Sequence, residues 1–181
     1  MSEQRTEELV LIALGSNISP ETNLPDAVGL LSLEKHVKVL KASSVWESEP
    51  VGFLEQPPFC NAAVSITTTL SPDELKNKLL EIEQKLQRVR DPANKNGPRT
   101  IDLDISLFGS IIFSSTKLQI PDPEIQTRPF LAIPLAEVAE NFKHPILDVK
   151  LSEIAEEFKE NCVLQQRLDI NLVQHVHKII D

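Results

Sequence analysis

The sequence predicts an α+β fold of the ferredoxin-like type, an α/β sandwich in which helices pack on a mainly antiparallel central sheet. Two observations support this prediction. Apolar segments of strand length and segments with helical periodicity follow one another in the order β-α-β-β-α-β. The chain has 181 residues, of which 41% are hydrophobic, which is enough for one well-packed domain and rather little for two. We therefore expect a single domain over residues 1–181, with a core at about 9–145 and a C-terminal extension at about 146–181.

The first part of the chain is expected to supply two strands, a helix and a loop. Residues 9–14 form a continuous apolar run that ends in the turn sequence Gly15-Ser16-Asn17, as in a central strand. Residues 23–35 carry apolar side chains at near-helical spacing and predict a helix. Residues 37–47 alternate loosely and predict a second strand. The proline-rich segment 50–58 is longer than a tight hairpin needs, which indicates an exposed functional loop.

The remaining elements follow from alternation and capping. Residues 59–70 alternate as a third strand does, and Ser71-Pro72-Asp73-Glu74 is a capping box with proline at the first helical position. The helix that it starts has one apolar stripe, which we interpret as core. A polar loop at 91–98, a strand within 97–105, a short strand near 111–113 and a helix over 128–140 come next. Helical patterns at 151–159 and 172–180 carry no motif that indicates chemistry.

Composition excludes several classes of partner. The formal net charge of -9 argues against broad binding to nucleic acids or anionic membranes, because both need a cationic surface. No apolar run approaches membrane-spanning length, and the polar N-terminus has no apolar signal core. Cys60 and Cys162 fit no metal-ligand spacing and are expected to be free thiols in a reducing compartment. We therefore expect a cytoplasmic protein.

The most informative stretch is Gly97-Pro98-Arg99-Thr100-Ile101-Asp102-Leu103-Asp104-Ile105. In a strand, Asp102 and Asp104 share one face, and the isoleucine and leucine side chains share the other. Two adjacent carboxylates repel each other unless a cation lies between them, and oxygen ligands suit magnesium or manganese. Arg99 adds a planar cation beside the acids. A metal and an arginine together indicate a phosphate-containing substrate.

Two further groups of residues point to ligand binding. A local basic island, formed by Arg88, Arg90, Lys95 and Arg99 with Lys117 and Arg128 further along, would let an acidic protein bind a nucleotide. For the first two arginines the alternative is a solvated helix C-terminus. Phe59 and Asn61 share one face of a predicted strand and offer an aromatic plate beside an amide, although core packing is the alternative for each phenylalanine.

The string around the two aspartates, followed by Leu107-Phe108-Gly109, resembles the signature of the 6-hydroxymethyl-7,8-dihydropterin pyrophosphokinase family. The resemblance extends from Ala13-Leu14-Gly15-Ser16-Asn17 through Phe59-Cys60-Asn61-Ala62-Ala63-Val64 to Arg128-Pro129-Phe130, and covers roughly residues 10–145. It implies an enzyme of folate biosynthesis that transfers pyrophosphate from ATP to the hydroxymethyl group of the reduced pterin. It also implies a monomer whose partners are these two small molecules.

The resemblance carries over residue by residue. It implies that Asp102 and Asp104 hold two magnesium ions, and that Arg88 and Arg99 act in catalysis through phosphate and transition-state contacts. The pterin contacts that it implies are Ser48, Val51, Phe59, Asn61 and Phe130. The ATP contacts that it implies are Glu83, Arg90, Arg99, Ile105, Lys117 and Arg128.

Two departures from the family pattern keep alternatives open. Pro121-Asp122 stands where most members have Pro-His, and an anion there should weaken ATP binding. The loop near Asn96 lacks the tryptophan that is frequent in the family and is one residue longer, so loop closure can differ. The first alternative is a drifted, non-catalytic module that binds pterin or nucleotide. The second is a metal-dependent nucleotide-sugar transferase, which leaves the aromatic-amide strand unexplained.

Overall fold

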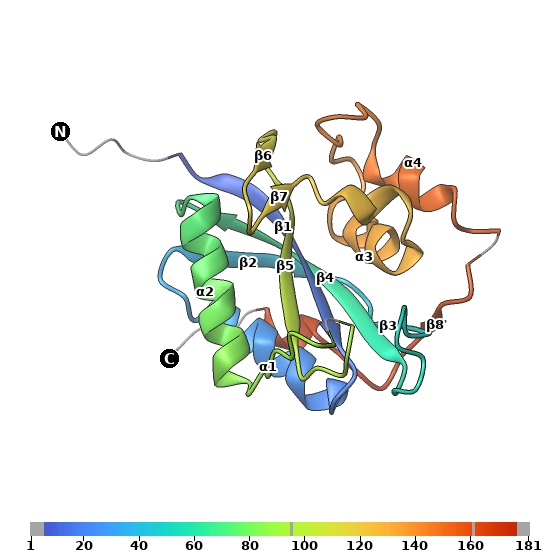
Figure 1. Ribbon diagram of the computed structural model, residues 1–181. Helices are drawn as coiled ribbons and strands as arrows, with labels where there is room; N and C mark the ends of the chain where they lie inside the picture. The colour runs from blue at the N-terminus through green and yellow to red at the C-terminus, as the bar shows by residue number, and fades with distance from the viewer. Residues whose placement is uncertain (1–5, 95, 161, 177–181) are drawn as a thin grey trace.

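The computed structural model describes residues 6–94, 96–160 and 162–176. Lys95 and the last part of the helix predicted at 172–180 lie outside the described residues. A twisted sheet runs through the middle of the molecule, with helices on both faces (Figure 1). The strands are β1 (Glu8–Ser16), β2 (Val37–Ala42), β3 (Trp46–Ser48), β4 (Phe59–Thr68), β5 (Asp102–Phe108), β6 (Phe113–Ser114), β7 (Gln119–Ile120) and β8 (Gln165–Gln166). The helices are α1 (Pro20–Ser32), α2 (Pro72–Lys85), α3 (Pro129–Ala139) and α4 (Leu151–Glu156), with 3-10 turns η1 (Pro123–Gln126) and η2 (Val173–His175).

The main sheet has six strands in the order β5-β1-β4-β3-β8, and β2 also pairs with β4. All of its pairings are antiparallel. The order places β1 and β4 in the centre, where their side chains are covered on both faces. This arrangement confirms the predicted ferredoxin-like α+β fold, and β6 and β7 pair with each other in a separate two-stranded sheet.

Two hydrophobic clusters cover the two faces of the sheet. On one face, α1 and α2 pack on β1, β4 and β5, and the C-terminal segment adds Ile170, Leu172 and Val176 to the same cluster. On the other face, α3 and α4 form the second cluster with Leu11, Ala63 and Leu107. The C-terminal extension is therefore part of the packed structure.

The capping box predicted for α2 is confirmed. The Ser71 hydroxyl accepts a hydrogen bond from the amide of Glu74, and the Glu74 carboxylate accepts one from the amide of Ser71. These bonds satisfy two amides that a helix N-terminus otherwise leaves unpaired. The start of α1 is less regular: the helix begins at Pro20, three residues before the predicted start, and it ends at Ser32.

The single strand predicted at 37–47 is two strands, and this corrects the sequence analysis. Ala42 pairs with Val64, whereas Trp46 pairs with Asn61. The segment from β2 to β3 therefore uses one residue more than β4 does over the same distance. At the irregularity, the Ser43 hydroxyl accepts the hydrogen bond of the Ala63 amide. Such a bulge redirects the strand, and here it leads β3 toward the loop at 50–58.

The C-terminal part differs most from expectation. A helix does follow residue 150, but it is short and ends at Glu156. Strand β8 was not predicted, because its partner β3 is about 120 residues earlier in the chain and the pairing leaves no local pattern. None of the described helices has the length and apolar character that a membrane crossing requires.

Candidate active site

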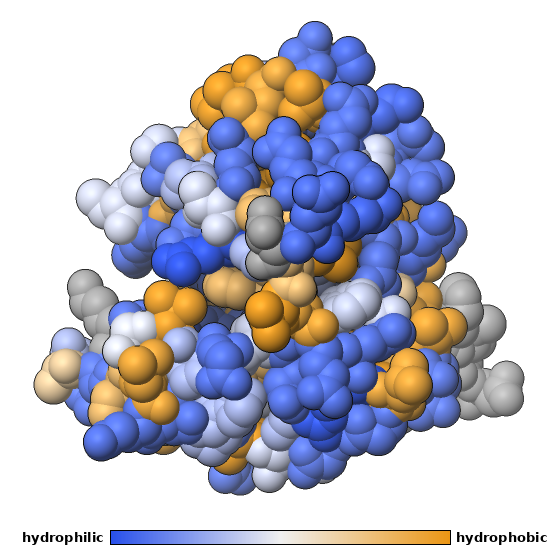
Figure 2. Space-filling view, turned by 90° about the vertical axis from the view of Figure 1, so that its right-hand side faces the viewer, coloured by the Kyte–Doolittle hydropathy of each residue, from blue (hydrophilic) through white to orange (hydrophobic). Residues whose placement is uncertain are grey.

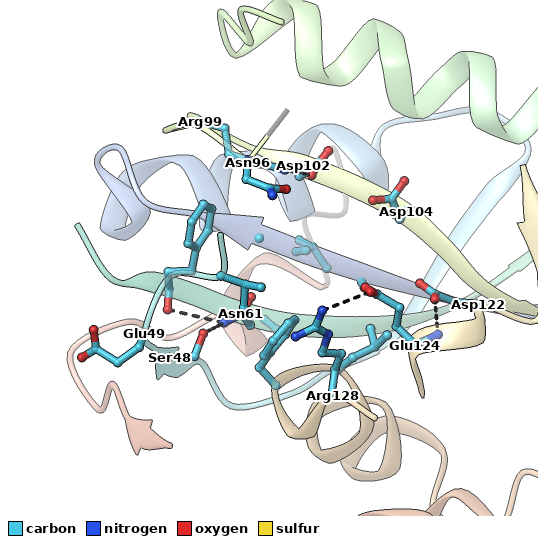
Figure 3. A pocket seen from close by; sticks show the side chains of 18 residues that line it. Ser48, Glu49, Asn61, Asn96, Arg99, Asp102, Asp104, Asp122, Glu124 and Arg128 are labelled. Carbon is cyan, nitrogen blue, oxygen red and sulfur yellow. Dashed lines mark hydrogen bonds and ion pairs between the residues drawn. The ribbon is translucent and has the colours of Figure 1, made fainter. Parts of the chain in front are cut away.

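A cavity of about 400 Å³ lies where β1, β4 and β5 meet the segment before α3. Figure 3 shows the two aspartates of β5 on one side of the cavity and Arg128 and Glu124 on the other, with Asn61 and Ser48 next to each other on the same side as Arg128. The surface view in Figure 2 is mostly hydrophilic, and apolar side chains form separate patches around a recess. The lining residues that carry polar or aromatic groups are Ser48, Glu49, Phe59, Asn61, Asn96, Arg99, Asp102, Asp104, Asp122, Glu124, Arg128 and Phe130.

Asp102 and Asp104 lie on the open face of β5, as their alternation predicts, and both line the cavity. A different cation contacts each one. Arg99 Nη1 donates to Asp102 Oδ2 at 2.5 Å, and Lys76 Nζ donates to Asp104 Oδ1 at 2.8 Å. The side chain of Arg88 is only 8% exposed, and its Nη2 is 3.8 Å from Asp102 Oδ1. Each carboxylate is therefore paired with a cationic side chain that a metal-bound substrate could displace.

A buried glutamate fixes the strand between the two acids. Glu83 is 1% exposed, and its Oε1 accepts a hydrogen bond from the amide of Leu103 at 2.9 Å. Its Oε2 accepts a hydrogen bond from Arg90 at 2.6 Å. Burial raises the pKa of the Glu83 carboxyl, and the hydrogen bonds from Leu103 and Arg90 oppose this shift. Glu83 is committed to these two partners and does not line the cavity.

Three of the five pterin contacts implied by the resemblance, Ser48, Phe59 and Asn61, come together on β3 and β4. Asn61 Nδ2 donates to the Ser48 hydroxyl at 2.9 Å, and both side chains are buried. No donor among the described residues bonds to Asn61 Oδ1. Phe59 lies two residues before Asn61 on the same face, and the guanidinium of Arg99 is 5.3 Å from the centre of its ring. This corner offers an oriented amide and an aromatic ring to a flat ligand.

The opposite wall is formed just before α3. Arg128 is the N-cap residue of the helix, and its guanidinium is 5.9 Å from the centre of the Phe130 ring. Its Nη2 also lies 3.3 Å from Glu124 Oε1. Phe130 and Phe59 thus line the same cavity from different elements.

Two loops close one end of the cavity, and they are bonded to each other. Gln56 Nε2 donates to the carbonyl of Asn96 at 2.7 Å. Gly52 has φ +85°, a backbone conformation that favours glycine, and a Cβ there would lie 2.5 Å from Asn96 Nδ2. Asn17 joins both loops to the sheet: its Nδ2 donates to Gln56 Oε1, and its Oδ1 accepts from the Arg99 amide.

Asp122 is the residue where the family pattern is broken, and it lines the cavity. Its carboxylate accepts a hydrogen bond from the amide of Glu124 at 2.8 Å and so caps η1. Burial raises the pKa of Asp122, and the charges of Asp104 and Glu124 raise it further, although the bond from Glu124 opposes the shift. Three acidic side chains, Asp104, Asp122 and Glu124, therefore lie close together in the wall of the cavity.

Nine of the predicted site residues line this one cavity: Ser48, Val51, Phe59, Asn61, Arg99, Asp102, Asp104, Arg128 and Phe130. Five others do not line it: Glu83, Arg88, Arg90, Ile105 and Lys117. Ile105 points into the core, and the side chain of Arg90 is 57% exposed beside Glu83.

Sequence reasoning missed Asn17, Lys76 and Gln56. Asn17 ends the first string that resembles the family, Ala13-Leu14-Gly15-Ser16-Asn17, and that position is the available signal. Lys76 has none, because its partner Asp104 is 28 residues away. The described residues contain no cluster of three or more side chains of the usual metal-ligating types.

Comparison with known proteins identifies the family of this chain. The family model described as 7,8-dihydro-6-hydroxymethylpterin-pyrophosphokinase matches residues 11–140, which include all fourteen predicted site residues. The chain belongs to this pyrophosphokinase family. A 2-amino-4-hydroxy-6-hydroxymethyldihydropteridine pyrophosphokinase of Bacillus subtilis is 44% identical over 133 residues, which cover 73% of this chain and 78% of the relative. A Synechocystis protein of the same name is 40% identical over 136 residues, which cover 75% of this chain and 68% of the relative.

Other family relatives are longer proteins. A folate synthesis bifunctional protein of Arabidopsis thaliana is 39% identical over 137 residues, and the match covers 75% of this chain but 28% of that protein. The fold is also found in the wild-type HPPK-DHPS of Plasmodium falciparum, with a TM-score of 0.66 at 14% identity. That alignment covers 88% of this chain and 43% of the solved chain. The pyrophosphokinase fold of this chain therefore occurs both alone and within larger proteins.

Proposed function

We propose that the protein transfers pyrophosphate from ATP to the hydroxymethyl group of 6-hydroxymethyl-7,8-dihydropterin, with AMP and the pterin diphosphate as products, in folate biosynthesis. The observation that carries the proposal is that one cavity is lined both by the acid pair of β5 and by the aromatic-amide corner of β3 and β4. The first suits a polyphosphate and the second a flat heterocycle. Membership of the pyrophosphokinase family supports the same reaction.

The donor set at the acid pair fits magnesium. Asp102 and Asp104 are oxygen ligands on one strand face, and Mg²⁺ in phosphate-handling sites keeps waters and substrate oxygens beside one or two carboxylates. We therefore infer that these two residues hold Mg²⁺, two ions by family resemblance. When bound, the ions would reduce the negative charge of the polyphosphate that repels the nucleophile.

The remaining phosphate contacts are assigned to arginines. Formation of AMP requires attack of the pterin hydroxymethyl oxygen on the β-phosphorus, while charge moves to the bridging oxygen of the leaving AMP. Arg99 and Arg128 line the cavity from opposite sides and can orient the polyphosphate between them. The guanidinium of Arg88 is buried beside the Asp102 carboxylate. We propose that Arg88 acts in catalysis by holding this carboxylate in place at the phosphate site.

At the other end of the cavity, the amide nitrogen of Asn61 donates to the Ser48 hydroxyl, which leaves the Asn61 carbonyl oxygen as an acceptor for a ligand. We propose that the pterin amino group donates to this oxygen and that the ring lies between Phe59 and Phe130. The network through Asn17 and Gln56 would close the loops over the bound substrates.

A second function, binding without turnover, is favoured by one observation. Asp122 puts a carboxylate into the cavity near Asp104, where it opposes the approach of a triphosphate. The experiment that separates the two functions is a magnesium-dependent assay with ATP and the pterin, in which AMP and the pterin diphosphate are followed by phosphorus NMR. Equal amounts of both products establish pyrophosphoryl transfer. Pterin or ATP binding in calorimetry without AMP formation establishes the binding module.

We further propose that residues 1–181 act as a single domain and a monomer in the cytoplasm, without nucleic acid or membrane partners. The sheet supports a single domain, because β8 from the extension pairs within it. The acidic charge supports small-molecule partners. Light scattering at micromolar concentration tests the monomer, and a dimer mass would refute it.

A further inference from the structure

The C-terminal segment reaches back to the strand that carries part of the pterin corner. Residues 141–181 lie outside the family match, yet Gln165 and Gln166 pair with Glu47 and Trp46 of β3. The pairing continues through the amide of Arg167, which donates to the carbonyl of Val45 at 2.9 Å. Figure 1 shows this segment passing along the outer edge of β3. Without it, β3 would be an edge strand.

Strand β3 depends on such support because it is short. It has three residues and three pairing positions with β4: Trp46 with Asn61, Glu47 with Cys60, and Ser48 with Phe59. A strand of this length is held weakly by one neighbour alone. The segment 49–58 that follows it is irregular apart from turns. The position of Ser48 therefore depends on what holds the other edge of β3.

Arg167 supplies the side-chain part of that support. Its Nη1 donates to Glu47 Oε2 at 3.0 Å and to Cys60 Sγ at 3.4 Å, so one guanidinium contacts both β3 and β4. Its Nε and Nη2 donate to the two carboxylate oxygens of Asp169 at 2.8 and 2.7 Å. The Asp169 pair fixes the plane of the guanidinium, because two parallel bonds allow one orientation.

These contacts lie behind the pterin corner. Successive residues of a strand point to opposite faces, so Glu47 and Cys60 face away from the cavity, whereas their neighbours Ser48, Phe59 and Asn61 line it. Burial raises the pKa of the Cys60 thiol to about 11, so the sulfur is neutral and accepts the bond without a charge of its own. The ion pair with Glu47 is the stronger contact.

We propose that β8 and Arg167 form a clamp on the back of the sheet that positions β3, and through it the Ser48–Asn61 pair, for pterin binding. This inference rests on the proposed function. Arg167 is a positioning residue: it touches neither substrate site. Its loss should affect the pterin and leave ATP nearly unaffected, because Asp102, Asp104 and Arg128 come from other elements.

Steady-state kinetics of Arg167→Gln, with each substrate varied in turn, tests the clamp. We expect KM for the pterin to rise about tenfold, as for loss of one or two charged hydrogen bonds that are partly open to solvent, with kcat and KM for ATP within about twofold. Arg167→Lys keeps a cation opposite Glu47 and should recover part of the loss. Leu168→Ala changes an adjacent side chain that is 83% exposed and should leave all three parameters unchanged. Val28→Ala, on the buried face of α1, controls for lower stability.

An independent measurement separates this inference from the reaction. Trp46 is the single tryptophan of the chain and lies on β3, so its quenching by acrylamide reports on that strand without any substrate. We expect acrylamide to quench Trp46 more strongly in folded Arg167→Gln than in the unmodified protein. Quenching in Leu168→Ala and Val28→Ala should equal that in the unmodified protein. Equal quenching in all variants, or a pterin KM that does not change relative to ATP, overturns the clamp. Absence of turnover in the unmodified protein would overturn the proposed function alone, and the quenching would still decide the clamp.

Discussion

The two faces of the sheet differ in how completely helices cover them. Behind the sheet, α1, α2 and the C-terminal segment bury the apolar side chains of β1, β4 and β5 in one continuous cluster. In front, α3 covers Leu11, Ala63 and Leu107 but leaves the ends of the same strands open, and there Asn61, Asp102 and Asp104 line the cavity. Strands that are buried on one face thus present polar side chains on the other. Substitutions on the two faces should therefore separate stability from chemistry.

The largest expected effect is on the closed face. Leu79 is fully buried between α2 and the sheet, and Leu79→Ala would leave a cavity there. We expect the free energy of unfolding to fall by about 2–5 kcal/mol, measured by urea denaturation. The KM values of the protein that remains folded should not change. A change in KM as large as the loss in stability would show that the two faces are coupled.

On the open face, the acid pair should affect chemistry more than stability. Asp102→Ala or Asp104→Ala removes one metal anchor, and we expect turnover to fall by at least about 10²-fold, by analogy with the loss of one preorganised electrostatic group. Thermal melting of Asp104→Ala should change little, because this carboxylate is 54% exposed. Asp102→Ala should also lower the melting temperature, because it leaves the buried Arg88 guanidinium without that carboxylate. Asp26→Ala, on the exposed side of α1, is the matched control. Normal turnover in both cavity variants would refute the metal assignment.

A smaller effect is expected at Asp122. Asp122→Asn keeps an acceptor for the Glu124 amide but removes the charge beside Asp104. We expect KM for ATP to fall about threefold to tenfold, since one repulsive contact with the triphosphate is lost in a partly solvated site. The matched control is Asp148→Asn, which changes an exposed aspartate outside the cavity. An increase in KM would show that Asp122 contributes to nucleotide binding.

The smallest expected effect is on the pH dependence of stability, through the buried His144. Burial lowers the pKa of His144, whose Nδ1 accepts bonds from the amides of Ile146 and Leu147. Above the unfolded-state pKa of about 6.5 both states are neutral, so there is no penalty. As the pH falls below it, the unfolded state takes up the proton first, and stability decreases by at most about 1.4 kcal/mol per pH unit.

His144→Asn offers an amide oxygen to the same two amides and has no titration in this range. Chemical denaturation at pH 7.5 and 5.5 should therefore give a smaller loss of stability on acidification in the variant than in the unmodified protein. Identical losses in both would mean that His144 does not contribute to acid sensitivity.

Local patterns determined much of this protein. The capping box at Ser71 and the alternation at Asp102 and Asp104 follow from rules that act over three or four residues, and the structure confirms both. The family resemblance was also carried by short strings, and the comparisons confirm the family. The roles of the individual site residues stay predictions.

Tertiary structure alone decided the rest. The sequence could not place Glu83 beneath Leu103, the bond between Gln56 and Asn96, or the bulge that separates β2 from β3, because each depends on which strand or loop lies opposite. The same holds for Arg167, which contacts residues more than 100 positions earlier in the chain. Periodicity records which way a side chain points, but not what it meets there, since contacts between distant segments form only when the whole sheet and its two clusters assemble.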